Sequence, residues 1–284
     1  MGDNRRLMSQ GRSGAGIIAG ILFAGLLAYA GGLAAMAWTQ GVLIRHYEIR
    51  LVLIGAEIAL ALPALLMAAI LASRVPELYR FRPLAPWGFL MSVGLGLTLW
   101  ALSLGVFEAQ YVLVKPPLEY LKQFQGLHES LKPVGVFGWI FSVTAIAVTP
   151  ALCEEILFRG LLTPALRRVA GPALAIIVSA ALFGAIHVDA MANGTAVYYR
   201  VPFAFFLGML LAKIRLDTES LWPPMIAHAT LNATTFVVVL FSEEQTDMLP
   251  DPQPLLALSM ILVGGALSWF LLRRLRAPEP ALSA

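Results

Sequence analysis

Apolar segments long enough to cross a lipid bilayer recur along nearly the whole chain, and this repetition most constrains its fold. A helix needs about 20 apolar residues to span the hydrocarbon layer. Eight segments approach or exceed this length, the fifth and sixth being the shortest: 14–38, 51–72, 86–106, 137–162, 172–188, 198–214, 221–241 and 255–272. We therefore predict an all-α fold, a polytopic bundle of about eight transmembrane helices.

The composition supports this class of protein. The chain is 59% hydrophobic and 13% charged, with a mean hydropathy of +0.78, which lies outside the range of soluble globular proteins. A pI near 9.2 is compatible with nucleic-acid binding. However, the basic residues form short clusters beside apolar runs, so no nucleic-acid partner is expected. The single cysteine, Cys153, excludes an internal disulfide, and we interpret it as a small buried thiol rather than a nucleophile.

The distribution of basic residues predicts the orientation in the membrane. Cytoplasmic segments of membrane proteins carry the excess of Lys and Arg. With the N-terminus inside, 14 of the 20 basic residues fall in inner segments and 6 in outer ones. The inner set is Arg5, Arg6, Arg12, Arg74, Arg80, Arg82, Arg159, Arg167, Arg168, Lys213, Arg215, Arg273, Arg274 and Arg276, and the outer set is Arg45, Arg50, Lys115, Lys122, Lys132 and Arg200. Both termini are therefore expected in the cytoplasm.

We divide the chain into three parts. Residues 1–134 hold the first three predicted helices, residues 135–241 a catalytic helix core, and residues 242–284 the last helix and a disordered tail. Within 115–132, an apolar stripe recurs at helical spacing: Tyr120, Phe124, Leu127 and Leu131. This segment is expected to be a helix that either lies in the membrane interface or packs on top of the bundle.

Three ionised residues interrupt the apolar run 135–166, all within the sequence ALCEEILFRG at 151–160. A charge near the bilayer centre costs roughly 2.5–3.5 kcal/mol on insertion scales, so such residues usually serve a function. Glu155 and Arg159 have the spacing and order of a helical ion pair. Glu154 points about 100° away on the helix and lacks that partner, which suits a general base. The alternative is a structural network that fixes helix packing. Glu57, alone in the second span, is given no role.

Two of the four histidines fall inside predicted spans of the same half of the chain. Phe183 precedes His187 by four residues, and Asn232 follows His228 by four, so each pair shares a helix face. Gly184 is expected to let a neighbouring helix approach closely. Counted at 1.5 Å per residue, the two histidines and Glu154 can meet in one cavity at middle depth. The side to which it opens does not follow from the sequence. His46 and His128 lie in predicted loops.

These residues form three motifs in order on successive spans: E-E-x-x-x-R (Glu154, Glu155, Arg159), F-x-x-x-H (Phe183, His187) and H-x-x-x-N (His228, Asn232). Together they resemble the CAAX-processing and bacteriocin-processing (CPBP, Abi-type) intramembrane proteases over about 135–241. The resemblance implies an intramembrane endopeptidase of the glutamic type. It also implies that Glu154 and His187 activate the attacking water and that His228 and Asn232 stabilise the oxyanion, with Glu155, Arg159 and Phe183 in support.

Other chemistries use the same side chains. Glu154, His187 and His228 would be a two-His, one-Glu set for Zn²⁺, as in zinc proteases. The sequence lacks H-E-x-x-H and the ligands would come from three helices, so we favour a metal-free mechanism with no cofactor. Intramembrane acids and histidines also mark transporters, and a non-proteolytic scaffold on the same fold is a further alternative.

The expected location is the bacterial cytoplasmic membrane, as a multi-pass protein, because the Ala-, Leu-, Gly- and Arg-rich composition is typical of bacteria. This disfavours the prenylated tails cut by eukaryotic members of the family. The expected partners are the lipid bilayer and a membrane-anchored protein or peptide substrate. Peptide bonds within a helix are shielded by their own hydrogen bonds, so the substrate must be unwound at the cut site.

Overall fold

The computed structural model describes residues 2–44, 47–71, 78–190, 195–241, 251 and 253–276, with residues 2–19 and Ala190 described by their backbone alone. His46 and the tail predicted to be disordered (277–284) lie outside these ranges. The elements, with η for π-helical turns, are α1 (Gly2–Leu43), α2 (Ile49–Leu71), α3 (Pro86–Leu113), α4 (Leu118–Ser130), α5 (Gly135–Val143), η1 (Thr144–Val148), α6 (Thr149–Glu155), η2 (Ile156–Leu162), α7 (Thr163–Ala185), β1 (Asp189–Ala190), β2 (Ala196–Val197), α8 (Arg200–Thr218), α9 (Trp222–Phe241) and α10 (Pro254–Leu275).

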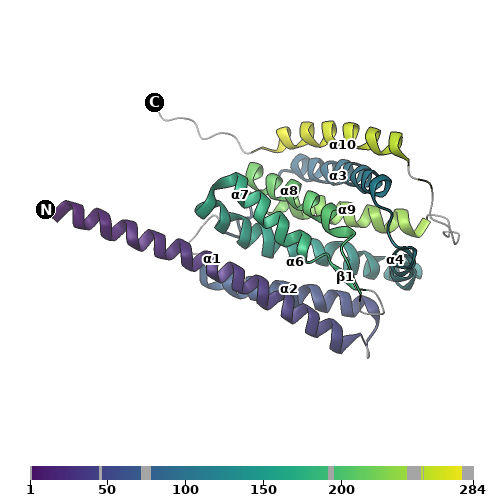
Figure 1. Ribbon diagram of the computed structural model, residues 1–284, viewed down its shortest axis with the longest axis horizontal. Helices are drawn as coiled ribbons and strands as arrows, with labels where there is room; N and C mark the ends of the chain where they lie inside the picture. The colour runs from purple at the N-terminus through teal and green to yellow at the C-terminus, as the bar shows by residue number, and fades with distance from the viewer. Residues whose placement is uncertain are drawn as a thin grey trace.

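The predicted all-α bundle is confirmed (Figure 1). Among the described residues, six helices are long and apolar enough to cross a membrane: Gly20–Leu43, Ile49–Ile70, Pro86–Leu113, Gly135–Ala185, Trp222–Phe241 and Pro254–Leu275. The predicted sixth span is also a helix, α8, but its ends carry Arg200, Lys213, Arg215 and Asp217. This charge keeps α8 outside the set of six.

The predicted fourth and fifth spans form one continuous helical stretch that folds back on itself. Gly171 interrupts α7 with φ +78° and ψ 174°, a conformation open to glycine and strained for other residues. The Thr163 hydroxyl donates to the Ser179 hydroxyl at 2.8 Å, so the segments before and after Gly171 lie side by side. The single apolar stretch therefore makes two passes through the bundle.

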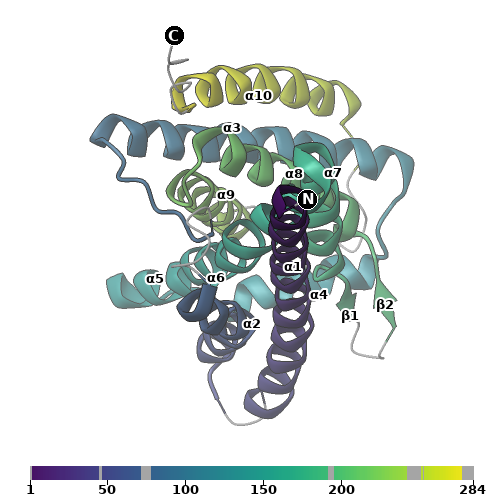
Figure 2. The same ribbon diagram turned by 90° about the vertical axis from the view of Figure 1, so that its left-hand side faces the viewer.

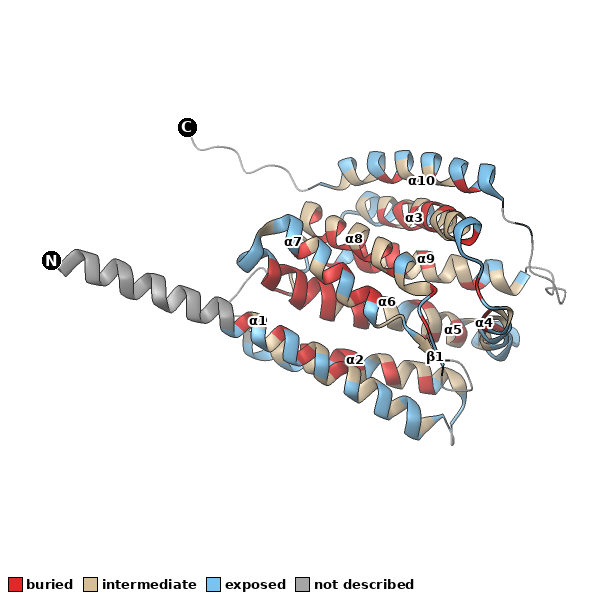
Figure 3. Cartoon of the chain, in the orientation of Figure 1, coloured by how far each residue is buried: buried red, intermediate tan, exposed pale blue. Residues whose placement is uncertain are grey.

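Helices pack in antiparallel pairs around a buried centre. In two orthogonal views, α1 lies along α2, and α3 lies between α10 and α9 (Figures 1 and 2). Buried residues gather on α6, α7 and α8, whereas exposed residues cover much of α2 and α10 (Figure 3). Many exposed side chains on α10 are large and apolar: Leu255, Leu256, Leu258, Leu262, Val263, Leu267, Trp269 and Phe270. Such an outer surface suits contact with lipid.

Helix α4 confirms the predicted helix in 115–132 and packs on the bundle, which was one of the two expected arrangements. Tyr120 and Leu131, at the two ends of the apolar stripe, are buried, being 4% and 0% exposed. Two charged residues between them, Lys122 and Glu129, are exposed. The stripe therefore faces the other helices of the protein.

The bundle has two distinct ends. The start of α1 and the end of α10 lie at one end, which we call the terminal end (Figure 1). Helix α4 and the β1–β2 hairpin lie at the opposite end, which we call the α4 end (Figure 1). The start of α1 and the end of α10 thus share one side of the bundle, as the orientation by basic residues requires, and their cytoplasmic location stays a prediction.

Close helix contacts predict a sharp difference between two glycines on α3. A Cβ added at Gly96 would lie 2.5 Å from Cβ of Thr230 and 2.6 Å from the Ala227 carbonyl oxygen on α9, whereas one at Gly94 would meet only Leu271 at 3.5 Å. We expect Gly96→Ala to destabilise the protein by about 1–3 kcal/mol through overpacking. Gly94→Ala should be neutral or stabilising, and thermal unfolding in detergent compares the two. Equal stability of both variants would contradict the described α3–α9 packing.

Candidate active site

The central acidic pair lies between two π-helical turns of one continuous helix. These turns, Thr144–Val148 and Ile156–Leu162, flank α6, which carries Glu154 and Glu155 at its end. A π-turn widens the helix by one residue and is frequent at functional sites. Both glutamates are buried, at 6% and 0% exposed, and Arg159 in the second turn is 0% exposed. The predicted intramembrane charges are therefore fully enclosed by protein.

The predicted ion pair between Glu155 and Arg159 is confirmed. Nη1 of Arg159 donates to Oε1 of Glu155 at 2.8 Å, and Nη2 donates to the Gly208 carbonyl oxygen at 3.0 Å. The guanidinium also lies over the ring of Phe183, 4.4 Å from its centroid. One cation thus joins η2 to α7 and α8, and the pairing offsets the cost of burying it.

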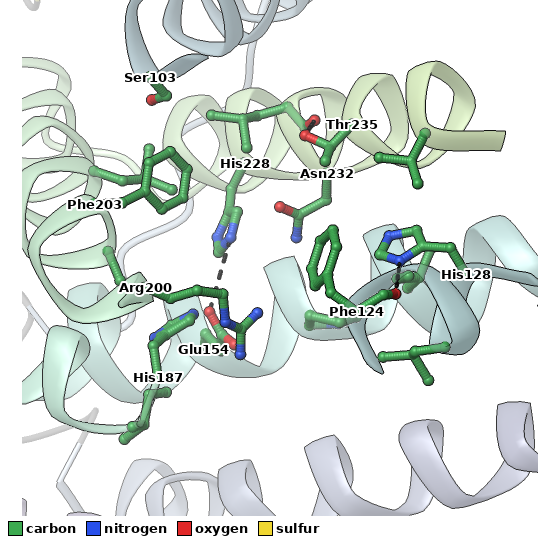
Figure 4. A pocket seen from close by; sticks show the side chains of 18 of the residues that line it. Ser103, Phe124, His128, Glu154, His187, Arg200, Phe203, His228, Asn232 and Thr235 are labelled. Atoms are coloured by element: carbon green, nitrogen blue, oxygen red, sulfur yellow. Dashed lines mark hydrogen bonds and ion pairs between the residues drawn. The ribbon is translucent and has the colours of Figure 1, made fainter. Parts of the chain in front are cut away.

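His228 on α9 bridges the two glutamates. Its Nδ1 lies 3.1 Å from Oε1 of Glu155, and its Nε2 lies 3.8 Å from Oε2 of Glu154 (Figure 4). Because the carboxylate of Glu155 is an acceptor, Nδ1 carries the proton of this hydrogen bond. The imidazole is therefore oriented by Glu155 and presents Nε2 to Glu154.

His187 follows the end of α7 and faces Glu154 from the opposite side (Figure 4). Its Nδ1 donates to the Phe183 carbonyl oxygen at 2.8 Å, so in the neutral imidazole Nε2 is an acceptor. The ring of Phe183, 0% exposed, lies 4.8 Å from that of His187 and 5.9 Å from that of His228. Phe183 thus packs against both imidazoles and the Arg159 guanidinium.

One cavity of about 530 Å³ takes in all four residues predicted to be catalytic. Asn232 lies one turn after His228 on α9, and its amide turns toward the cavity (Figure 4). Most other wall residues are apolar, including Trp100, Phe107, Phe124, Phe203, Leu207 and Leu231. Glu154, His187 and His228 thus share one cavity, as expected from their depths, and Asn232 lines it as well, whereas their chemical roles stay a prediction.

No role was predicted for Glu57, which the structure brings to the same cavity. Glu57 comes from α2, and its Oε2, like Oε2 of Glu154, is buried without a hydrogen-bond partner in the described part of the chain. The two carboxyls therefore line the same cavity. The only signal in the sequence was the presence of an acid inside an apolar span, with nothing to name its neighbour.

Arg200, which the sequence placed at the outer end of the sixth span and to which no role was given, begins α8 and lines the cavity. Its Nε and Nη2 donate to the two carboxylate oxygens of Asp189 at 2.8 and 2.7 Å. The hydroxyl of Tyr120 on α4 donates to the same carboxylate at 3.1 Å. Burial raises the pKa of Tyr120, so this hydroxyl keeps its proton. The contacts join α4, the β-hairpin and α8; we call them the Tyr120–Asp189–Arg200 clasp.

His128, which lies in the loop segment predicted to contain a helix, belongs to α4 and is 4% exposed. Its Nδ1 donates to the Phe124 carbonyl oxygen at 2.9 Å, and its ring lines the cavity. Burial lowers the pKa of His128, which therefore stays neutral near pH 7. The amphipathic stripe was a correct guide to the helix, but it did not mark this histidine as part of the inward face.

A comparison with protein families finds one match, which coincides with the part of the chain that forms this site. Residues 136–234 match the family described as type II CAAX prenyl endopeptidase Rce1-like. The match shows that these residues are similar to that family, and it covers about a third of the chain. The match confirms the resemblance inferred from the three motifs, which covered 135–241. Neither the curated proteins nor the solved structures contain a match to the chain.

The matched region, residues 136–234, does not present an assembled metal site among its described residues. Among the described residues, no three side chains of His, Cys, Asp or Glu are grouped as ligands for one ion. Nδ1 of His187 is bonded to the Phe183 carbonyl oxygen and Nδ1 of His228 to Glu155. The Zn²⁺ alternative from Glu154, His187 and His228 is therefore not preassembled in the described part of the chain, and Nε2 of each ring is the nitrogen that would coordinate an ion.

Removing one member of the buried ion pair should lower the stability of the protein far more than removing both members. We expect Glu155→Ala to destabilise the protein by about 3–5 kcal/mol, because Arg159 is left as an uncompensated buried charge. The double variant Glu155→Leu/Arg159→Met should recover much of this stability, since both charges are gone. It should still be inactive, because His228 has lost the acceptor that orients it.

Thermal unfolding in detergent, paired with a cleavage assay, tests both parts of this prediction. If the double variant were less stable than Glu155→Ala, these residues would not stabilise the fold mainly through their ion pair. If the double variant cleaved substrate normally, Glu155 would not orient His228.

Proposed function

We propose that this protein is a metal-free, glutamate-dependent intramembrane endopeptidase. The observation that carries the proposal is the convergence of Glu154, His187, His228 and Asn232 on one largely apolar cavity. The Rce1-like match over 136–234 supports a protease in the membrane. Six long apolar helices support an integral membrane protein, and we propose the bacterial cytoplasmic membrane as its location.

The proposed reaction begins with a water held between Glu154 and His187. The carboxylate of Glu154, whose Oε2 has no partner in the described part of the chain, removes a proton as the water oxygen attacks the carbonyl carbon of the substrate. Nε2 of His187, an acceptor because Nδ1 donates to the Phe183 carbonyl oxygen, orients the same water. When the tetrahedral intermediate collapses, the C–N bond breaks and Glu154 passes its proton to the leaving amine.

Asn232 and His228 then stabilise the oxyanion of the tetrahedral intermediate by donating hydrogen bonds to it. Both lie on one face of α9 and line the cavity. The side-chain amide of Asn232 has two N–H donors, and no hydrogen bond ties it to another described residue. His228 donates from Nε2 when that nitrogen is protonated, and Glu155 holds the ring in the required orientation at 3.1 Å. Donors fixed before the reaction stabilise the oxyanion without reorganisation.

The metal-free mechanism is favoured over a zinc enzyme by the contacts already in place. Glu155 engages Nδ1 of His228, and Nε2 of the same ring lies 3.8 Å from Glu154. Among the described residues, no three ligand side chains are grouped for one ion, whereas Nε2 of His228 already has the Glu154 carboxyl as its neighbour. In a transporter, polar groups would be distributed along a path from one side of the bundle to the other. Here the polar side chains line one cavity.

The proposed substrates are membrane-anchored proteins or peptides with an extended segment at the cut site. A cavity bounded by helices admits a strand-like chain more readily than a folded domain, and peptide bonds in a helix are already hydrogen-bonded. The matched family is described as a CAAX prenyl endopeptidase. We propose that its peptidase activity is shared here, without the prenyl requirement.

Glu154→Gln should lower cleavage by about 10²–10⁴-fold or more while leaving folding and membrane insertion intact, because the amide is isosteric but is not a base. The most informative measurement compares membrane proteomes of wild-type and Glu154→Gln strains by N-terminal labelling. New N-termini present only in the wild type would identify the substrates. Ser103→Ala, at another wall position of the cavity, is the matched control and should retain activity. Normal cleavage by purified Glu154→Gln protein would refute the assignment.

Removing metal ions distinguishes the metal-free mechanism from the zinc-dependent one. Purified protein treated with phenanthroline or EDTA should keep its activity and contain substoichiometric zinc by elemental analysis. Close to one Zn²⁺ per chain, with activity lost on its removal and restored on its return, would instead establish a metalloprotease.

A further inference from the structure

The cavity reaches only one end of the bundle, and we infer from this that the protease receives its substrate from the extracytoplasmic side of the membrane. The inference rests on the proposed function and adds to it the class of substrate. That class is a membrane-anchored protein or peptide whose cut site lies in an extended segment outside the cytoplasm.

The long helices contribute to the cavity wall mainly with the half that lies toward the α4 end. Helix α1 contributes residues near its end and α2 residues near its start, α3 contributes its later part and α8 its first part, and α9 contributes from His228 to near its end. The wall positions on these helices are Met36 and Gln40; Leu53 and Glu57; Trp100, Ser103, Leu104 and Phe107; His228, Leu231, Asn232, Thr235 and Val239; and Arg200, Phe203, Ala204 and Leu207.

The cavity is deep along the bundle axis. On α9 its wall runs from His228 to Val239, which at 1.5 Å per residue is about 16 Å. His228 marks the inner limit at 3% exposed, whereas Gln40, on α1, is an exposed wall residue. The proposed catalytic groups therefore lie at the closed inner part of the cavity.

Beyond the catalytic groups, the terminal end of the bundle is filled with protein. The π-helical turn after Glu155 carries fully buried side chains, and facing positions on α7 and α8 are equally enclosed: Leu157, Phe158, Arg159, Leu161, Leu162, Phe183 and Leu211 are all 0% exposed. The backbone of this turn is also covered, because Gly160 accepts from the Tyr79 N–H at 3.1 Å and Arg159 accepts from Nε of Arg215 at 3.1 Å. No wall residue of the cavity comes from this layer.

At the opposite end, the cavity is bordered by a small helix rather than by a packed core. Five residues of α4 belong to the wall: Tyr120, Leu121, Phe124, Leu127 and His128. The Tyr120–Asp189–Arg200 clasp ties this helix to the β-hairpin and α8. A substrate segment that enters the cavity therefore passes α4 before it meets Glu154.

The charge distribution assigns these ends to the two sides of the membrane. Described basic residues at the terminal end are Arg80, Arg82, Arg167, Arg168, Lys213, Arg215, Arg273, Arg274 and Arg276, and those toward the α4 end are Arg50, Lys115, Lys122, Lys132 and Arg200. The excess of Lys and Arg marks the cytoplasmic side. The α4 end, and with it the cavity, then faces away from the cytoplasm. A cytoplasmic cut site would meet the closed layer instead.

Single cysteines in a Cys153→Ala background test the inference. The cavity probe is Thr235→Cys; the surface controls are Gly126→Cys on α4, where an added Cβ meets nothing within 4 Å, and Val169→Cys at the terminal end, 49% exposed. Right-side-out and inverted vesicles are treated with a small membrane-impermeant cationic methanethiosulfonate. Thiols left unreacted are then counted by a maleimide gel shift after denaturation.

We expect the reagent to block Thr235→Cys and Gly126→Cys in right-side-out vesicles only, and Val169→Cys in inverted vesicles only. Blocking of Thr235→Cys from the inverted side, or from neither side, would overturn the inference. Reversed behaviour of the two surface controls would overturn it as well, because the α4 end would then be cytoplasmic.

The labelling needs no catalysis, so its outcome is independent of the proposed function. The N-terminal comparison with Glu154→Gln adds a second check, since cut sites should map to extracytoplasmic segments of membrane-anchored proteins. Glu154-dependent cut sites confined to cytoplasmic segments would refute the entry side while upholding the protease. Loss of the Glu154 dependence would refute the protease while leaving the labelling result intact.

Discussion

The buried contact between Arg159 and Glu155 is the interaction on which the rest of this structure depends. A guanidinium that is 0% exposed inside an apolar bundle requires a carboxylate and further acceptors. It obtains them from three elements, since Glu155, the Gly208 carbonyl and the face of Phe183 all contact it. Glu155 in turn orients His228, so the charge that fixes helix packing also fixes the geometry of the proposed catalytic groups.

Around this pair, the site is built from a rigid inner layer and a more open outer layer. The inner layer consists of large side chains without exposure, such as Phe158, Leu161 and Leu162. The outer layer consists of helix ends, α4 and the clasp that joins it to the β-hairpin. An intramembrane protease must exclude bulk water from its helices while admitting both water and a peptide to one point. A cavity closed at one end meets both requirements.

Sequence reasoning was most successful where the relevant spacing is local. The apolar runs predict the helices, and the four-residue spacing of Glu155 and Arg159 predicts their ion pair because neighbours on a helix are three or four residues apart. The same rule placed Asn232 beside His228. The expected close approach at Gly184 also holds, since an added Cβ there would lie 3.2 Å from the Val201 carbonyl oxygen on α8.

What the sequence did not predict depends on contacts between distant parts of the chain. Glu57 acquires its setting from α6, and Arg200 from Asp189 and Tyr120, and no periodicity along one helix records such neighbours. The two π-helical turns around α6 were not predicted from the sequence either. Hydropathy likewise predicted eight spans. One of them, α8, carries charged residues at its ends and is not among the six helices that are long and apolar enough to cross a membrane.

The reach of these contacts along the chain has a consequence for biogenesis. Arg159 leaves the ribosome 49 residues before Gly208 and 56 before Arg215, and Glu155 precedes His228 by 73 residues. While the hairpin around Gly171 enters the bilayer, Arg159 has only the nearby Glu155 as a charged partner. The remaining acceptor and the second histidine arrive with α8 and α9. An incomplete chain therefore holds the proposed base without its oriented imidazole, so hydrolytic competence should arise only late in synthesis, once α9 has joined the bundle.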